Sequence, residues 1–424
     1  MRVLLVNTSE KAGGAAVATH RLMEALNNNG VKAKMLVADK QTDDIRVVQL
    51  SHPWRHRCHF LWERFTIWCH LRFSRKHLFE IDTASNGTDI TRTKEFQEAD
   101  IIHLAWINQG MLSMGDIRKI VSSGKPVVWT MHDIWPMTAL CHLTLGCHKF
   151  TTHCADCKYL PGGGSSRDLS YKIWERKNKV YRHGNISFVA CSRWLAREAQ
   201  HSALRGNLHV EAIPNPINTQ VFRSHDKQEA RQSLGLPAHQ RLLLFVAQRA
   251  TNVNKGMSYL IEACRKLVEQ NAGRQQDLGL VILGGHADEY ADQLSLPVYP
   301  LGYVNEEQRI VQVYNAVDAF VLPSLSENLP NTIMEAMACG VPCIGFQVGG
   351  IPEMIDHLRN GYVARYCDAD DLARGISWTL YEADHQQLEH AAVQKVAASY
   401  SQGAVSLRYI EVYNQAIAFT NYHI

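Results

Sequence analysis

Residues 322–355 read LPSLSENLPNTIMEAMACGVPCIGFQVGGIPEMI, and this stretch decides which fold the sequence predicts. Its apolar and polar runs predict in turn a buried strand, a polar loop, a helix and a second buried strand, at 319–322, 324–329, 331–338 and 341–346. Pro330 stands at the start of the helix, where no backbone amide hydrogen is needed, and Gly340 follows it as a helix stop. The pattern therefore places Glu327 in the loop and Glu335 inside the helix.

The loop after such a strand is a place where ligands bind. In an open parallel sheet, ligands bind at the carboxyl ends of the strands, and Glu327 follows such an end. The N-terminus of the next helix adds unpaired amides and the positive end of the helix dipole, which both favour a phosphate group. The alternative is that Glu327 and Glu335 are solvated charges on either side of a short helix.

The complete pattern resembles the signature of the retaining glycosyltransferases of family 4. Two glutamates are separated by seven residues, and GVP at 340–342 and GGIPE at 349–353 follow them. The resemblance implies that Glu327, Asn328 and Leu329 contact the donor sugar and its diphosphate, and that Glu335 binds the ribose hydroxyls. It also implies the GT-B fold, in which two Rossmann-like, doubly wound α/β domains face each other across a cleft.

The length and composition predict a globular protein with two domains. A chain of 424 residues is too long for one ordinary core, and 46% of the residues are hydrophobic while 20% are charged. A net charge of +3 does not argue for nucleic acid as a partner. The sequence shows neither a run of about 20 apolar residues nor a signal peptide, so a cytoplasmic location is expected. The 11 cysteines are then expected as thiols or metal ligands and not as disulfides.

Strand-like and helical runs alternate along the chain, which predicts parallel, doubly wound sheets. One series of short apolar runs lies at 3–7, 34–38, 101–105, 127–130 and 188–191. A second series lies at 242–247, 278–283, 298–303, 319–322 and 342–346. Two prolines at 213–216 separate the series and exclude helix there. We therefore predict an acceptor-side domain at 1–215, a nucleotide-sugar domain at 216–400, and a C-terminal helix within 401–424 that crosses back to the first domain.

Two features of the first domain fit the resemblance. Gly13 and Gly14 lie between the first strand and a predicted helix, where glycines let the backbone approach a ligand closely. The resemblance implies that this loop faces the diphosphate and the acceptor, and that His132, at the end of another strand, hydrogen-bonds a hydroxyl of the donor sugar. The simpler alternatives are helix–strand packing for the glycines and a structural role for His132. Asp133 would either orient His132 or cap the turn.

Two cations in the second domain also fit the resemblance to family 4. Arg249 ends a predicted strand and Lys255 precedes the next helix. Family members carry Arg and Lys in this arrangement, which implies that both contact the donor diphosphate. The loop at 250–254 lacks the proline that is usual in the family, so Arg249 matches less closely than Lys255. The alternative is a pair of surface cations on a loop.

A cysteine-rich insert at 141–157 is not explained by this signature. It contains Cys141, Cys147, Cys154 and Cys157, and the last two have the Cys-x-x-Cys spacing with which thiolates chelate Zn²⁺. A similar run occurs in a subset of bacterial exopolysaccharide glycosyltransferases, including those of colanic-acid-type pathways. We predict a structural zinc site, with disulfide pairing and unconnected thiols as alternatives. Four cysteine ligands would leave no open position on the metal, so a catalytic metal is not expected there. The resemblance implies that cationic side chains take the role of a metal and that catalysis requires no cofactor.

The segment 52–77, HPWRHRCHFLWERFTIWCHLRFSRKH, is rich in aromatic and basic residues. Its apolar residues at helical spacing are Trp54, Cys58, Leu61, Phe65 and Trp68. The cations away from that face are Arg55, Arg57 and Arg64, and the cations that follow the helix are Arg72, Arg75 and Lys76. This pattern suits a helix on the surface of an anionic membrane, on the inner face of the plasma membrane. It equally suits an ordinary amphipathic helix packed on the first domain.

Together these features favour a retaining glycosyltransferase that moves a sugar from a nucleotide-diphosphate sugar to a saccharide or lipid-linked saccharide in bacterial polysaccharide synthesis. Within enzymes, the rival is a nucleotide-sugar epimerase of similar fold. A rival from another class is a zinc-knuckle protein that binds nucleic acid, which would leave two complete α/β domains unexplained. The sequence leaves the donor sugar, the base and the acceptor open, because loop shape decides them.

Overall fold

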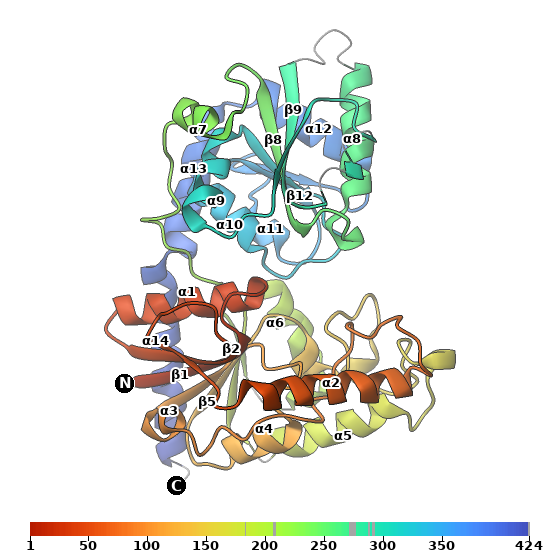
Figure 1. The fold of residues 1–424 in the computed structure, drawn as a ribbon, viewed down its shortest axis with the longest axis vertical. Coiled ribbons are helices and arrows are strands. Elements are labelled where there is room, and N and C mark those ends of the chain that lie inside the picture. The colour runs from red at the N-terminus through yellow and green to blue at the C-terminus, as the bar shows by residue number, and fades with distance from the viewer. Residues whose placement is uncertain (183, 207–208, 271–276, 287–288, 291–292, 423–424) are drawn as a thin grey trace. The chain divides into compact units, whose positions relative to one another are not determined.

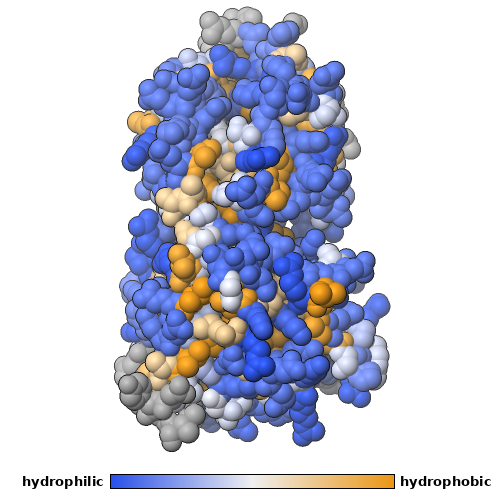
Figure 2. Space-filling model, turned by 90° about the vertical axis from the view of Figure 1, so that its left-hand side faces the viewer, coloured by the Kyte–Doolittle hydropathy of each residue, from blue (hydrophilic) through white to orange (hydrophobic). Residues whose placement is uncertain are grey.

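The computed structural model describes all residues except 183, 207–208, 271–276, 287–288, 291–292 and 423–424. The described chain forms two compact units, Met1–Pro216 with Val405–Ile424 as unit 1, and Ile217–Ala404 as unit 2 (Figure 1). Among the described helices, none has both the length and the apolar character that a membrane span requires. The face drawn in Figure 2 is mostly hydrophilic, with apolar side chains in separate places.

Unit 1 is built on a seven-stranded sheet in which every neighbouring pair is parallel. In spatial order the strands are β3 (Val47–Gln49), β2 (Lys32–Asp39), β1 (Arg2–Ser9), β4 (Ile101–Leu104), β5 (Val127–Met131), β6 (Ile186–Ala190) and β7 (Val210–Ala212). The helices are α1 (Gly14–Asn28), α2 (Pro53–His70), α3 (Lys94–Glu98), α4 (Met114–Val121), α5 (Leu169–Arg182), α6 (Arg193–Gln200) and α14 (Gln402–Tyr422). From β1 to β3 each new strand is added on one side of β1, and from β4 onward on the other side, so the order reverses between β1 and β4 as in a doubly wound sheet.

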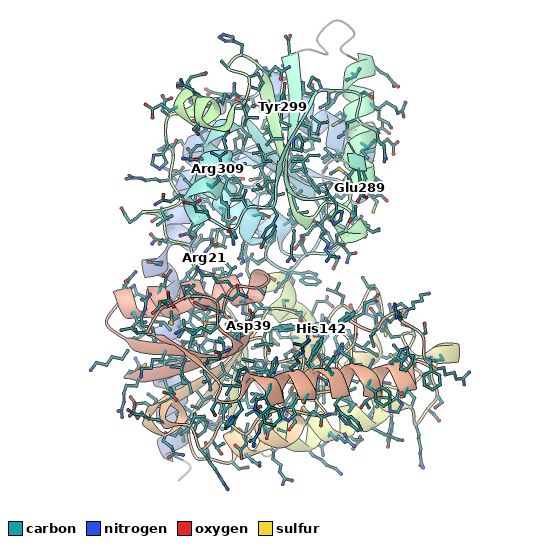
Figure 3. All side chains as sticks on the ribbon, viewed as in Figure 1. Arg21, Asp39, His142, Glu289, Tyr299 and Arg309 are labelled. Atoms are coloured by element: carbon teal, nitrogen blue, oxygen red, sulfur yellow. The ribbon has the colours of Figure 1, made fainter. Side chains whose placement is uncertain are left out.

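Both faces of this sheet are buried, as the continuous apolar strands predict. In β1, Val3 and Leu5 belong to one core cluster, and Leu4 and Val6 to another. Successive side chains of a strand point to opposite faces, so β1 takes part in both cores. Polar contacts begin where the strand ends, for example between Ser9 Oγ and the carboxylate of Asp39 on β2 (3.0 Å). Asp39 is labelled in Figure 3.

The C-terminal helix α14 completes one of these cores. Val405, Tyr409 and Tyr413 pack in the same cluster as Val3 and Leu5 of β1. Buried His103 on β4 fixes the helix, because its Nδ1 lies 2.5 Å from the Tyr413 hydroxyl and its Nε2 lies 2.8 Å from Thr130 Oγ1. Burial lowers the pKa of His103 to about 3, so the ring is neutral.

Unit 2 has a six-stranded parallel sheet of the same topology. Its strands, in spatial order, are β10 (Val298–Gly302), β9 (Leu278–Gly285), β8 (Arg241–Arg249), β11 (Ala319–Leu322), β12 (Cys343–Phe346) and β13 (Gly361–Ala364). Its helices are α7 (Lys227–Leu234), α8 (Met257–Gln270), α9 (Glu307–Ala316), α10 (Asn331–Ala338), α11 (Ile351–Met354), α12 (Ala369–Ser377) and α13 (His385–Ser399). The predicted fold class of two doubly wound α/β sheets is confirmed.

Every predicted strand falls on an observed one, while three short strands were not predicted. These are β3, β7 and β13, of three or four residues each at or near the sheet edges. Gly14, which the sequence placed between the first strand and the next helix, is the first residue of that helix. Helix α1 begins at Gly14, directly after Gly13 at φ +92°, and α14 begins at Gln402.

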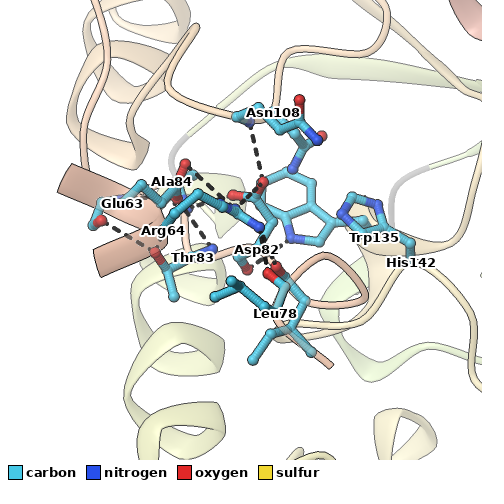
Figure 4. A network of polar contacts seen from close by, with 12 residues as sticks. Glu63, Arg64, Leu78, Asp82, Thr83, Ala84, Asn108, Trp135 and His142 are labelled. Carbon is cyan, nitrogen blue, oxygen red and sulfur yellow. Dashed lines mark hydrogen bonds and ion pairs between the residues drawn. The ribbon is translucent and has the colours of Figure 1, made fainter. Parts of the chain in front are cut away.

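Helix α2 buries two charged residues and leaves most of its predicted apolar stripe exposed. Glu63 and Arg64 are buried, and Arg64 donates hydrogen bonds to the Leu78 carbonyl (2.7 Å) and to the buried carboxylate of Asp82 (3.0 Å; Figure 4). The interpretation of Arg64 as one of the surface cations of 52–77 is therefore wrong. The periodicity of this helix predicted which residues share a face, but not which face points inward.

Glu63 in this network offers a test through pH. Burial, followed by the nearby Asp82 carboxylate, raises the pKa of Glu63 to about 8. The folded state then binds a proton that the unfolded state loses near pH 4.5, so stability falls as pH rises from about 4.5 to 8. We expect Glu63→Gln to raise the free energy of unfolding by about 1–3 kcal/mol at pH 8, and by less at pH 5.

Urea unfolding at a series of pH values measures this difference. Exposed Glu80, which pairs with His77 at 2.8 Å, provides the matched control Glu80→Gln, with an expected change below about 0.5 kcal/mol. A Glu63→Gln effect that is constant with pH would contradict the assignment.

Candidate functional site

The loops after β8 and β11 bring two predicted site residues into contact. Lys255, next to the start of α8, forms an ion pair with Glu327, and Ser324 Oγ donates a hydrogen bond to Glu327 Oε1 (3.0 Å). The two loops are also joined through the backbone, because the Leu325 amide donates to the Asn254 carbonyl (2.8 Å). Since β8 and β11 are neighbours where the strand order doubles back, the pair lies where an open α/β sheet binds ligands.

Two glycines allow these loops to approach each other. A Cβ on Gly256 would overlap the carbonyl oxygen of Pro323, and a Cβ on Gly349 would overlap that of Glu327. Both glycines have positive φ, +71° and +56°, which side-chain-bearing residues rarely adopt. The loop after β11 is thus held between the loops after β8 and β12, and Glu327 is fixed through its own backbone.

The other residues predicted around the donor lie in the same unit. The Asn328 carbonyl accepts a hydrogen bond from the Gly350 amide (2.9 Å), and Leu329 is buried before α10. Glu335, inside α10, is buried and accepts a hydrogen bond from the Tyr314 hydroxyl (2.9 Å). Arg249 is exposed at the end of β8, opposite Gly285 on β9.

In unit 1 the predicted residues lie at the carboxyl edge of the sheet. Gly13 follows β1 and has φ +92° with nothing within 4 Å of an added Cβ, so backbone conformation and not crowding favours glycine. Its carbonyl accepts the Val17 amide, and Gly14 begins α1. Buried Glu10 anchors the preceding turn by accepting the backbone amides of residues 41 and 42 (2.6 and 2.9 Å).

His132 follows β5 and contacts a cysteine. Its Nδ1 lies 3.2 Å from Cys191 Sγ, and that sulfur also lies 3.1 Å from the Met131 carbonyl oxygen. Burial lowers the pKa of His132 to about 4, which keeps the ring neutral at physiological pH. A neutral imidazole can exchange a hydrogen bond with a sugar hydroxyl without adding charge to the site.

Asp133 caps the turn. One carboxylate oxygen accepts the Trp135 amide (2.8 Å), and the other accepts Trp106 Nε1 (3.0 Å) and His142 Nδ1 (2.8 Å). Burial lowers the pKa of His142, but the Asp133 and Asp82 carboxylates together raise it more, so the net pKa is above its ordinary value. His142, labelled in Figure 3, thus belongs to a part-buried polar cluster with Asp133 and Trp106.

Sequence reasoning missed Ser324, Cys191, Trp106 and Tyr314 as partners of the predicted residues. Ser324 could have been found from the sequence, because it lies two residues after the end of β11 and three residues before Glu327. The partners of His132 and Asp133 come from the ends of other strands or from the insert, at sequence separations that no local pattern reveals.

The four cysteines of the insert are free thiols. Cys141, Cys154 and Cys157 pack as partly buried side chains against the core of unit 1, and burial raises the pKa of Cys141 and of Cys154 to about 12. Over the described ranges, no group of three or more His, Cys, Asp or Glu side chains is arranged to hold a metal ion. The structural zinc site at these four cysteines therefore stays a prediction.

Comparison with protein families supplies the decisive observation. Residues 12–221 match the family described as Glycosyltransferase Family 4, and residues 226–395 match Glycosyl transferases group 1. The chain belongs to the glycosyltransferases. The first match lies almost entirely in unit 1 and the second lies in unit 2.

Among curated glycosyltransferases, D-inositol 3-phosphate glycosyltransferase 2 of Catenulispora acidiphila is 28% identical over 49% of this chain and 51% of that protein. N-acetyl-alpha-D-glucosaminyl L-malate synthase of Bacillus anthracis is 25% identical over 53% of this chain and 58% of that protein. Each match thus spans about half the length of the relative, and the exopolysaccharide setting remains a prediction.

Solved glycosyltransferase structures share the fold over almost the whole chain. Sucrose-phosphate synthase from Thermosynechococcus elongatus has a TM-score of 0.66 at 17% identity, covering 98% of this chain and 99% of that one. Anabaena HepE, solved in complex with UDP-glucose, has a TM-score of 0.63 at 17% identity and covers 100% of both chains. At these identities the likeness shows the GT-B fold alone.

The crowding at Gly349 can be tested by a substitution. We expect Gly349→Ala to lower the free energy of unfolding of this glycosyltransferase by about 2–4 kcal/mol, because it adds overlap with the Glu327 carbonyl to the cost of positive φ. Gly302→Ala is the matched control, since Gly302 has φ +68° but an added Cβ there meets nothing within 4 Å. Gly302→Ala should lower the free energy of unfolding by about 1 kcal/mol. Chemical denaturation measures both, and equal losses would contradict the close approach of the two loops.

Proposed function

We propose that the protein is a retaining glycosyltransferase that moves a sugar from a nucleotide-diphosphate sugar to a saccharide or lipid-linked saccharide acceptor in bacterial polysaccharide synthesis. The observation that carries the proposal is the Lys255–Glu327 ion pair, held on loops that follow two adjacent strands of a doubly wound sheet. The binding of UDP-glucose by HepE, which shares the fold, supports this class of donor.

Lys255 and Arg249 would bind the donor diphosphate. The leaving nucleotide gains negative charge as the glycosidic bond breaks, so cations at this position stabilise the transition state more than the ground state. Each charge-assisted hydrogen bond contributes roughly 1.5–3 kcal/mol, and two would supply on the order of 10² to 10⁴ in rate. In the structure Lys255 is part-buried against Glu327 while Arg249 is exposed, so Lys255 is the better fixed of the two.

Glu327 and the start of α10 would hold the sugar and the phosphates. Glu327 is fixed by Ser324, by Lys255 and by the close approach of Gly349 to its backbone, so its carboxylate is pre-positioned to accept hydrogen bonds from hexose hydroxyls. Asn328 and Leu329 lead into α10, whose first amides would face phosphate oxygens. Buried Glu335, supported by Tyr314, would accept hydrogen bonds from the ribose hydroxyls.

Unit 1 would supply His132 and the turn at Gly13 and Gly14. The neutral imidazole of His132 would hydrogen-bond a sugar hydroxyl, while the turn would present backbone amides to the diphosphate and the acceptor. We assign no covalent nucleophile. Attack by the acceptor on the same face from which the nucleotide leaves would retain the anomeric configuration, and the donor phosphate would take up the acceptor proton. The site needs no metal for these steps, because cationic side chains stabilise the leaving group.

Release of free nucleotide from UDP-, GDP-, ADP- and dTDP-sugars by slow hydrolysis tests the proposal. We expect Lys255→Ala and Glu327→Ala each to lower the turnover number with the active donor at least about 100-fold, with an unchanged melting temperature. Lys266→Ala is the matched control, because Lys266 pairs with Asp370 and Glu262 on the surface of the same unit. Its turnover should stay within about twofold of wild type.

Calorimetric binding of the corresponding nucleoside diphosphate provides a second measurement. Lys255→Ala should weaken that binding, while Lys266→Ala should leave it unchanged. A wild-type protein that neither binds nor hydrolyses any of these donors, or a Lys255→Ala variant with near-normal turnover, would refute the assignment.

A further inference from the structure

Helix α2 exposes large apolar side chains along one side. These side chains, with the exposed Phe73 that follows the helix, form what we name the α2 patch. Its members are Trp54, Leu61, Trp62, Phe65 and Phe73, with exposed fractions of 61%, 56%, 60%, 50% and 65%. In a soluble protein, isolated apolar side chains on the surface are ordinary, but a contiguous group of this size marks an interaction surface.

Four aromatic rings at the C-terminal end of α2 are continuous, because the half-buried ring of Trp68 links the patch residues Phe65 and Phe73. Trp62 and Phe65 have ring centroids 5.8 Å apart, Phe65 and Trp68 6.2 Å, and Trp68 and Phe73 4.8 Å. Trp68 Nε1 also donates a hydrogen bond to the Phe73 carbonyl (2.7 Å), which fixes the segment after the helix against its last turns. The part of the patch from Trp62 to Phe73 is therefore one connected surface.

The opposite side of α2 explains why these residues face outward. Glu63 and Arg64 point inward, where Arg64 bonds Asp82 and Glu63 accepts hydrogen bonds from the amide and hydroxyl of Thr83 (3.2 and 2.9 Å). Turning the helix to bury its aromatic side would break this network and leave charges without partners, at a cost of several kcal/mol. The exposed apolar side is thus built into the packing of unit 1.

Cations surround the patch. Five exposed basic residues lie on or directly after the helix, namely Arg55, Arg57, Arg72, Arg75 and Lys76. The two acidic residues of 52–80 do not offset them, because Glu63 is buried and Glu80 is paired with His77. An apolar helix side bordered by arginine and lysine complements a surface with negative headgroups over an apolar interior.

We propose that the α2 patch docks the protein on an anionic lipid surface. The helix would lie in the plane of the interface, with Leu61 and Phe65 entering the acyl region and tryptophans at the level of the headgroups. Arg72, Arg75 and Lys76 would contact the headgroups. This docking goes beyond the proposed sugar transfer, since none of these residues belongs to the proposed site.

Co-sedimentation with vesicles tests the docking. Vesicles of phosphatidylcholine with 30% phosphatidylglycerol should bind wild type at least about 10-fold more tightly than pure phosphatidylcholine, and added salt should weaken the binding. Leu61→Ser/Phe65→Ser should weaken it about 10-fold or more. The matched control is Leu407→Ser/Phe419→Ser, which changes the same residue types at similar exposure, 64% and 52%, on α14. It should bind like wild type.

Charge reversal tests the cations separately. Arg75→Glu/Lys76→Glu should also weaken binding to the anionic vesicles about 10-fold or more. Lys32→Glu/Lys34→Glu changes the net charge equally from exposed positions on β2, and should have less than about a threefold effect. Unchanged melting temperatures and unchanged release of nucleotide from the donor would show that all four variants are folded.

Three outcomes would overturn the docking. The first is a wild-type protein that does not bind the anionic vesicles. The second is a result in which Leu61→Ser/Phe65→Ser and Arg75→Glu/Lys76→Glu bind the anionic vesicles as tightly as their matched controls do. The third is light scattering that shows a dimer in wild type and a monomer in Leu61→Ser/Phe65→Ser, since a second copy of the chain would then cover the patch. Each outcome leaves the proposed transfer reaction intact, because nucleotide release is measured without lipid.

Discussion

Parallel strands that are buried on both faces confine the polar chemistry of each unit to the ends of the strands. In β1, Val3 and Leu5 face one core while Leu4 and Val6 face the other, so neither face can carry a site. In β11 the same holds, because all four residues are buried and the first polar side chain of the loop is Ser324. The side chains that can meet a ligand are thus those of the loops, and the sheet fixes where the loops begin.

The loops of unit 2 are held by backbone contacts before any ligand binds. Gly256 and Gly349 let the loops after β8 and β12 close on the loop between Pro323 and Pro330, and Lys255 then reaches Glu327. The pair compensates its own charges in a part-buried position, so neither side chain carries an unpaired charge before a donor arrives. In the proposed reaction, a diphosphate would replace this partner of Lys255 by a side-chain movement alone, which would keep the reorganisation cost of binding low.

The sequence predicted the sheets and the loop residues for a shared physical reason. Buried strands need unbroken apolar runs, and turns with positive φ need glycine. Neighbouring residues are therefore enough to predict the strand at 319–322 and the turn at Gly349. Strands of three or four residues, such as β3, have too few side chains to form an apolar run that the sequence reveals. The partners of His132 and Asp133 depend on which strand ends meet in space, and Cys191 and Trp106 could not be assigned to them from local pattern. The zinc site that the cysteine spacing of the insert predicts stays a prediction, because among the described residues no group of three or more His, Cys, Asp or Glu side chains is arranged to hold a metal ion.

Helix α2 shows why periodicity alone does not distinguish a core helix from an interfacial one. A stripe of Trp54, Leu61 and Phe65 is compatible with either, because spacing says which residues share a face and nothing about what covers it. The deciding contact lies outside the helix, in Asp82, whose buried carboxylate pairs with Arg64 and so draws the charged side of the helix inward. A buried ion pair rarely adds net stability over apolar packing, but it penalises strongly the arrangement in which one partner is lost. Asp82 therefore sets the rotation of α2, and the aromatic side is left to the solvent by the same contact that anchors the helix.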